Sequence, residues 1–313
     1  AVIVAVLNGQ GGFYEAVMNL AEIESDVPLT MGQKGVFASF FGPDLPNLIG
    51  VVILTSLGTW GLPQMVHKFY AIKDEKSIKS GTIISTFFAI VVSGGCYFLG
   101  GFGRLYDTPA IYSESGKIMY DAIIPAMLST LPDILVGVVV VLVLSASMST
   151  LSSLVLTSSS TLTLDLLKDN IIKDMNEKKQ LLIMRIMLVF FIVVSVVIAL
   201  DPPTFIAQLM GISWGALAGA FLAPFLYGLY WKGVTKAAVW ASFICGVLLT
   251  LSNMFLRFIA SPINAGAIAM IAGGIIVPGV SLITPKMDKK KLDSIFSCLD
   301  ETVTVSRKKS IEE

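Results

Sequence analysis

The sequence predicts an all-α membrane protein built as a polytopic bundle of helices. Of its 313 residues, 55% are hydrophobic and only 14% are charged, and the mean hydropathy is +0.80. A soluble domain carries about 25% charged residues. This composition therefore excludes a soluble enzyme and a disordered chain, and the zero formal net charge gives no reason to expect a nucleic-acid partner. The second observation behind the fold class is the spacing of the apolar residues, which form long runs separated by short polar joints.

Seven apolar stretches are long enough to cross a bilayer, for which a helix needs about 20 apolar residues. They cover residues 47–68, 81–103, 134–161, 182–200, 204–230, 237–257 and 264–284. Residues 1–8 read as the end of an eighth span, and the chain starts inside this apolar run without Met. We therefore expect a fragment that lacks preceding helices. Its transmembrane core would cover 1–284 and its cytoplasmic tail 285–313.

Two segments between the spans are amphipathic. Residues 13–23 and 117–131 alternate apolar and polar positions with a helical period. Either they lie along the membrane surface or they pack onto neighbouring helices.

Basic residues set the expected orientation in the membrane. Eighteen Lys and Arg residues lie in the tail or in the joints that follow the first, third, fifth and seventh of these stretches, and four lie on the opposite face. The positive-inside rule places the richer face, and with it the C-terminus, in the cytoplasm of a multi-pass plasma-membrane protein. All 44 charged residues lie in joints or at helix ends, so the visible spans offer little for proton coupling.

Side chains suited to catalysis are scarce. His67 is the single histidine, and Cys96, Cys245 and Cys298 show no metal or disulfide spacing. No nucleophile–base pair or metal cluster falls at membrane depth, so we do not expect an enzyme.

The span at 47–68 contains helix-breaking residues near its middle. Gly58, Gly61 and Pro63 fall within six residues. Proline removes a backbone donor, and glycine lowers the cost of unwinding. A broken span is typical of a transporter's substrate site, while a plain proline kink is the alternative.

The span at 134–161 is rich in hydroxyl groups, with twelve Ser or Thr residues between 145 and 163. Small residues allow close helix packing, which is one explanation. The other is a site for a hard monovalent cation, because residues at i, i+3 and i+4 share a face. That spacing brings the Ala146 carbonyl near the hydroxyls of Ser149 and Thr150.

Four segments together resemble the sodium/solute symporter family, which includes proline, pantothenate, sialic acid and sodium/glucose transporters. These segments are Gly61–Asp74 (GLPQMVHKFYAIKD), Met148–Ser153 (MSTLSS), Ser158–Leu166 (SSSTLTLDL) and Leu217–Gly233 (LAGAFLAPFLYGLYWKG). The resemblance implies two inverted five-helix repeats with discontinuous helices that meet at the bilayer midplane. The span at 47–68 matches the first helix of the second repeat.

The same resemblance implies sites for Na⁺ on the serine-rich helix. The main sodium site matches Ala146, Ser149 and Thr150, with further carbonyls from a helix upstream of the chain. Ser152 and Ser153 match the second sodium site that some members have.

Substrate residues are expected at the broken span. Proline carriers of the family place aromatic residues where this chain has Thr55 and Thr59, which weakens a proline reading. Trp60 and Gln64 offer a stacking group and an amide beside the break, unless they face other helices.

The expected function is sodium-coupled import of a small organic solute, such as an amino acid, a pantothenate-like compound or another carboxylate, by alternating access. The expected partners are the solute, Na⁺ and the lipid bilayer, and no obligate protein partner is evident. The alternatives are a proton-coupled or uncoupled carrier of the same fold, and a membrane solute sensor.

Overall fold

The computed structural model describes residues 1–66, 72, 74–172 and 175–297. The chain divides into two units. The first comprises Ala1–Gln10 and Tyr106–Phe205, and the second comprises Gly11–Leu105 and the chain from Ile206 onward. Each unit is described by itself. His67 and the tail residues 298–313 lie outside the described residues.

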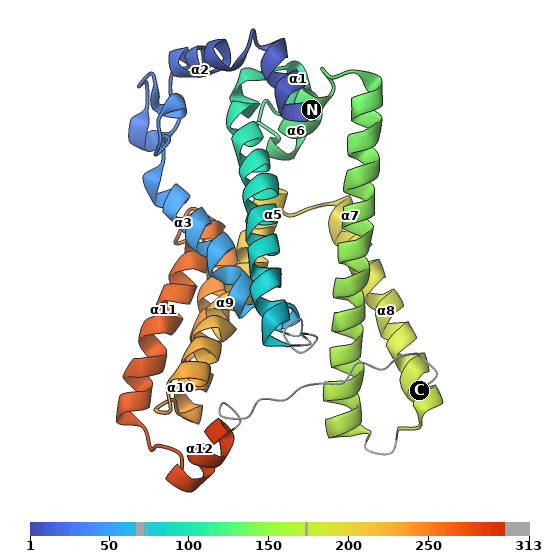
Figure 1. The fold of residues 1–313 in the computed structure, drawn as a ribbon, viewed down its shortest axis with the longest axis vertical. Coiled ribbons are helices and arrows are strands. Elements are labelled where there is room, and N and C mark those ends of the chain that lie inside the picture. The colour runs from blue at the N-terminus through green and yellow to red at the C-terminus, as the bar shows by residue number, and fades with distance from the viewer. Residues whose placement is uncertain (67–71, 73, 173–174, 298–313) are drawn as a thin grey trace. The chain divides into compact units, whose positions relative to one another are not determined.

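Six helices of the described chain are long and apolar enough to cross a membrane (Figure 1). They are α5 (Glu75–Gly101), α7 (Asp133–Ser160), α8 (Glu177–Leu200), α9 (Ile206–Tyr230), α10 (Lys236–Leu256) and α11 (Pro262–Ile283). Each coincides with a predicted span to within a few residues. The all-α polytopic fold class predicted from the sequence is confirmed.

The remaining apolar stretch, 47–68, is interrupted and does not form one continuous spanning helix over its described residues. It comprises α3 (Leu45–Ser56), the 3₁₀ turn η3 (Gly58–Gly61) and the single turn α4 (Pro63–Val66). The side chain of Asp44 caps α3 by accepting a hydrogen bond from the Asn47 N–H at 3.0 Å. Leu62 between η3 and α4 is extended, with φ −83° and ψ 119°. A residue that precedes proline is driven out of the helical region by the proline ring, which explains why the helix stops there.

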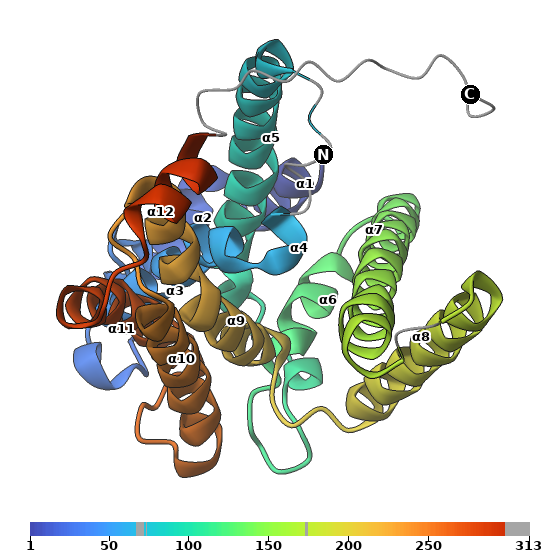
Figure 2. The same ribbon diagram turned by 90° about the horizontal axis from the view of Figure 1, so that it is seen from below.

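Helices α9, α10 and α11 pack against one another through glycine and alanine in the second unit (Figure 2). A Cβ atom on Gly215 would lie 2.5 Å from the Gly266 Cα, and one on Gly219 would lie 2.8 Å from the Ala269 Cβ. Small residues at such positions let helix backbones approach closely, which is how helices associate where lipid removes the hydrophobic driving force. A buried cluster completes this core and joins α3 to the bundle: Leu54, Ala218, Leu222, Ile263 and Met270.

Elsewhere in the second unit, α2 (Phe13–Glu22) contacts η2 (Val36–Ala38) and η5 (Phe102–Leu105), and η1 (Pro28–Thr30) lies between α2 and η2 along the chain. The ring of Phe13 stacks on Phe98 of α5 with centroids 6.0 Å apart. The guanidinium of Arg104 lies 2.9 Å from the Asp26 carboxylate and 4.0 Å above the Phe37 ring. The amphipathic segment 13–23 therefore packs onto neighbouring elements, as the second of its two explanations requires.

The first unit holds α1 (Val2–Gly9), η6 (Pro109–Ile111), η7 (Tyr120–Ala122) and α6 (Ile123–Leu128) besides α7 and α8. Helix α7 continues into η8 (Thr161–Ile171), a stretch of π-helix that packs on α7 and α8. Val6 of α1 is buried, and its carbonyl accepts a hydrogen bond from the Tyr106 hydroxyl at 3.4 Å. A last short helix, α12 (Lys289–Phe296), follows α11 in the second unit.

Candidate functional site

The helix interruption presents two threonines whose hydroxyl protons are already engaged. The Thr55 hydroxyl donates to the Val51 carbonyl at 2.8 Å, and the Thr59 hydroxyl donates to the Ser56 carbonyl at 3.2 Å. Both residues are half-buried. Each hydroxyl keeps lone pairs that can accept a hydrogen bond from a solute.

Trp60 and Gln64 flank the interruption in different settings. The Trp60 side chain is 58% exposed in η3, and Gln64 in α4 is half-buried. Trp60 is therefore open to a stacking partner. Behind them, Gly61 is buried against α9, because a Cβ there would lie 2.8 Å from the Ala218 Cα. Gly58 is also buried but has room, since its nearest neighbours would be 3.8 Å from a Cβ.

Two of the predicted ligands of the main sodium site lie together on α7. The Thr150 hydroxyl donates to the Ala146 carbonyl at 3.0 Å, so the two oxygens are one turn apart on one face. With its proton held by the carbonyl, the Thr150 oxygen turns its free lone pairs outward. An open depression of about 400 Å³ lies over this spot, lined by Ala146, Ser147, Thr150, Leu151 and Leu154.

Ser149 connects the two predicted sodium sites. Residues at i, i+3 and i+4 share a helix face, so Ser149 lies on one face with Ser152 and Ser153. The Ser152 hydroxyl donates to the Met148 carbonyl at 2.7 Å, and the Ser153 carbonyl accepts from the Thr157 hydroxyl at 2.9 Å. All three serines are exposed on α7.

We call the face of α7 that carries the predicted sodium ligands the strip. Its oxygen atoms are all uncharged, and its residues are Ala146, Ser149, Thr150, Ser152 and Ser153. Within the described part of the chain, no group of three or more His, Cys, Asp or Glu side chains is placed to hold a metal ion. Carbonyl and hydroxyl oxygens suit hard cations. A strip without carboxylates suits a single positive charge better than a double one, so its donor set fits Na⁺.

The sequence did not predict two polar groups in the helices, the Thr163 hydroxyl and the Tyr227 hydroxyl. Thr163 in the π-helical η8 is fully buried, and its hydroxyl has no hydrogen-bond partner among the described residues. Tyr227 of α9 donates its hydroxyl to the Gly274 carbonyl of α11 at 3.0 Å. Pro278 was the available signal for this bond, because a proline removes the N–H that would otherwise bond to the carbonyl four residues earlier.

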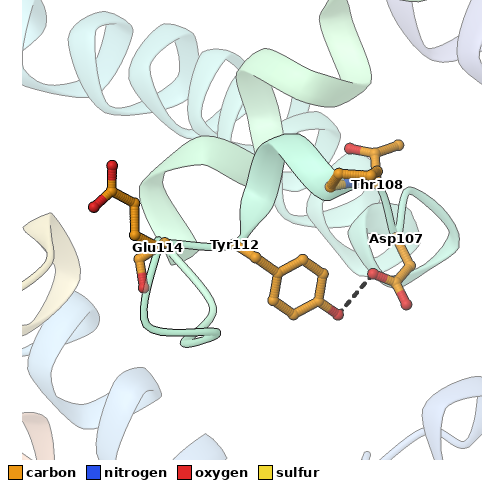
Figure 3. Close-up of a pocket in the computed structure, with 6 residues that line it drawn as sticks. Asp107, Thr108, Tyr112 and Glu114 are labelled. Carbon is orange, nitrogen blue, oxygen red and sulfur yellow. Dashed lines mark hydrogen bonds between the residues drawn. The ribbon is translucent and has the colours of Figure 1, made fainter.

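Another open depression lies in the connection between α5 and α7. It encloses about 570 Å³ and is lined by Asp107, Thr108, Pro109, Tyr112, Ser113 and Glu114. Figure 3 shows the Tyr112 hydroxyl donating to the Asp107 carboxylate, at 2.7 Å, while the Glu114 carboxylate points away from this pair. The two carboxylates do not converge, so this pocket offers no cation site.

Comparison with known proteins identifies a family whose sequence pattern this chain matches. The Sodium:solute symporter family model matches residues 1–246, which contain both the helix interruption and the strip on α7. The chain is 28% identical over 249 residues to the sodium/pantothenate symporter of Haemophilus influenzae, covering 78% of this chain and 48% of that protein. It is 28% identical over 204 residues to an osmoregulated proline transporter of Bacillus subtilis, covering 62% and 39% respectively.

A third relative extends the similarity toward the C-terminus. The sodium/pantothenate symporter of Escherichia coli is 27% identical over 295 residues, covering 90% of this chain and 58% of that protein. The chain thus spans about half the length of the curated relatives it matches.

Proposed function

Because this chain belongs to the sodium:solute symporter family, we propose that it takes part in sodium-coupled import of a small organic solute. Na⁺ is a substrate in this scheme, carried together with the solute. The chain is a multi-pass membrane protein of a transporter family. We place its C-terminal face in the cytoplasm, since eighteen of its 22 basic residues lie on that side of the expected topology.

The arrangement of oxygens on α7 supports the sodium part of the proposal most directly. Ala146 and Thr150 present a carbonyl and a hydroxyl oxygen 3.0 Å apart beside an open depression. Oxygen ligands about 2.4 Å from an ion in octahedral geometry are about 3.4 Å from each other, so this pair needs little adjustment to share one ion. We assign Ala146, Ser149 and Thr150 to the main sodium site, and Ser152 and Ser153 to a second one.

The helix interruption is the proposed substrate site. A break in a helix at membrane depth is tolerated where it lines a cavity or is buried in protein, and Gly58, Gly61 and Pro63 lie at this break. Thr55, Thr59, Trp60 and Gln64 are the side chains we assign to solute contact. The relatives are named for pantothenate and proline, both of which are carboxylates, so we propose a carboxylate or amino-acid substrate.

Coupling in this scheme follows from shared preference for one conformation. External Na⁺ binds first and stabilises the outward-open form, and solute binding then allows closure. Because both bind the same conformation, each raises the affinity for the other. A membrane potential of 100 mV drives each inward charge with about 2.3 kcal/mol. A tenfold sodium gradient adds about 1.4 kcal/mol. One ion thus supports solute accumulation of several hundredfold.

Uptake by the protein in proteoliposomes tests the proposal. An inward sodium gradient is compared with an equal potassium gradient, over a panel of labelled amino acids, pantothenate and short carboxylates. We expect one compound to accumulate only with sodium. Equal uptake in both gradients, or uptake driven by a proton gradient alone, would select an uncoupled or proton-coupled carrier instead. Binding of a solute without uptake would indicate a sensor.

A further inference from the structure

The end of the α9–α11 bundle at which α12 lies combines basic and aromatic side chains. The α9–α10 connection and the end of α11 meet there, because the Thr235 N–H donates to the Ser281 hydroxyl at 3.2 Å and the Thr235 and Thr284 hydroxyls are 2.6 Å apart. Tyr230, which ends α9, is 82% exposed. Exposed aromatic and basic side chains at the ends of spanning helices are the signature of a membrane–water interface.

Helix α12 cannot lie far from that interface. Spanning helix α11 ends at Ile283 and α12 begins at Lys289. The six backbone steps from Ile283 to Lys289 span at most about 22 Å when extended. Lys232 also holds α12 at the bundle, with its ammonium 3.2 Å from the Asp293 carboxylate and 5.3 Å above the Phe296 ring. Figures 1 and 2 show α12 at this end of α9 and α10.

The residues of α12 divide around its axis into an apolar and a polar side. At about 100° per residue, Leu292, Ile295 and Phe296 fall within one sector. Lys289 and Lys291 border that sector on its two sides. Lys290 falls opposite to it, beside Asp293 and Ser294. All three lysines are exposed, and the Ile295 side chain is 50% exposed.

We infer that α12 lies in the bilayer surface and binds anionic phospholipid headgroups through Lys289 and Lys291. An interfacial helix inserts its apolar sector between headgroups, and long lysine side chains at the border reach the phosphates. Lys286, in the connection before α12, is also exposed and adds positive charge at the same place. The inference depends on the chain being embedded in a membrane and not on the transport proposed above.

A fluorescent label at position 295 tests the inference on the intact chain. Ile295→Cys is introduced after Cys96, Cys245 and Cys298 are replaced by serine, and the new thiol carries an environment-sensitive dye. The protein is reconstituted in phosphatidylcholine vesicles with increasing phosphatidylglycerol. We expect the emission to shift to the blue as phosphatidylglycerol rises, and lipids spin-labelled near the headgroup to quench the dye. High salt should reverse the shift, since screening weakens charge attraction at a surface.

Two single substitutions with the same charge change separate a lipid contact from general charge. Lys291→Gln should raise the phosphatidylglycerol fraction needed for the shift by about fivefold, the factor equivalent to about 1 kcal/mol for one lysine at a membrane surface. Lys290→Gln should leave the titration nearly unchanged, because this lysine is directed away from the lipid. Equal effects of the two variants would overturn the inference. So would a dye that is shifted but not quenched by lipid, or one that ignores phosphatidylglycerol. Solute uptake measured on the same vesicles reports on the transport proposal separately.

Discussion

At the scale of single residues, α7 shows how a membrane helix can display oxygen without charge. The Thr150 and Ser152 hydroxyls each direct their proton to a carbonyl one turn earlier and keep lone pairs for another partner. Which of these oxygen-bearing residues share a face of α7 could be predicted from the sequence, because helical spacing alone decides it. That the strip and the helix interruption belong to different units of the chain could not be predicted from local spacing.

Thr150→Ala should raise the sodium concentration needed for half-maximal uptake by about tenfold, the effect of losing about 1.4 kcal/mol of ion binding. Thr150→Ser keeps the hydroxyl and should restore the sodium dependence. Thr157→Ala is the matched control, because this threonine makes the same bond to a carbonyl four residues earlier, at 2.9 Å and two turns further along α7. Sodium titrations of uptake measure all three. An equal loss in Thr157→Ala would reduce the strip to a helix-packing surface.

Tyr227→Phe should lower the free energy of unfolding by about 0.5–1.5 kcal/mol, because it removes the donor to the Gly274 carbonyl. Pro278→Ala should reduce this loss, since alanine supplies a backbone N–H to the same carbonyl. A double-mutant cycle on the detergent-solubilised chain, followed by thermal unfolding, measures the coupling. Additive effects of the two changes would show that the bond does not compensate for the proline.

At the scale of elements, the interruption between α3 and α4 was predictable because its cause is local. Proline at 63 acts on its immediate predecessor, and Leu62 is extended as a result. The closeness of η3 to α9 was not predictable, because Gly61 and Ala218 are far apart in the sequence. A glycine within a span indicates that the helix is easily unwound there. It does not indicate which other helix packs closely against that glycine.

Gly61→Ala should destabilise the protein by about 1–3 kcal/mol, because the added methyl group would lie 2.8 Å from a backbone atom of α9 that cannot move independently. Gly58→Ala is its control within the same turn, since the nearest atoms at 3.8 Å leave ordinary van der Waals contact. Melting temperatures of the two purified variants provide the comparison. A fall in both alike would mean that loss of backbone freedom, rather than contact with α9, sets the cost.

At the scale of the whole molecule, the described helices fall into two classes by their surroundings. The most apolar parts of α5, α7 and α8 bury none of their residues within the described chain, whereas those of α9 and α11 each bury 39%. Hydropathy predicted all these helices equally well, because it measures compatibility with lipid. It carries no information on which helices pack together, and that was supplied here by the contacts of Gly215, Gly219 and Gly246.

Gly266→Ala should lower the melting temperature of the chain, because a Cβ there would lie 2.8 Å from the Gly215 Cα and 2.9 Å from the Gly211 carbonyl oxygen. The expected cost is again about 1–3 kcal/mol, as for an overpacked core. Gly279→Ala, further along α11, has no atom within 4 Å of the new Cβ and should be neutral. Thermal unfolding in detergent distinguishes them, and an unchanged melting temperature for Gly266→Ala would contradict the close packing of α9 on α11.

The contact between Gly215 and Gly266 restricts how these two positions can change during evolution. Neither position can accept a side chain unless the opposite helix backbone has moved away. A single substitution at either glycine therefore gives a protein in which the two helices pack poorly. Lineages that inherit this bundle should therefore retain both glycines together, or lose them together with a change in helix spacing. Gly94 and Gly100 of α5 have no atom of the described chain within 4 Å of an added Cβ, so no such interdependence ties these two positions to another helix of that part of the chain.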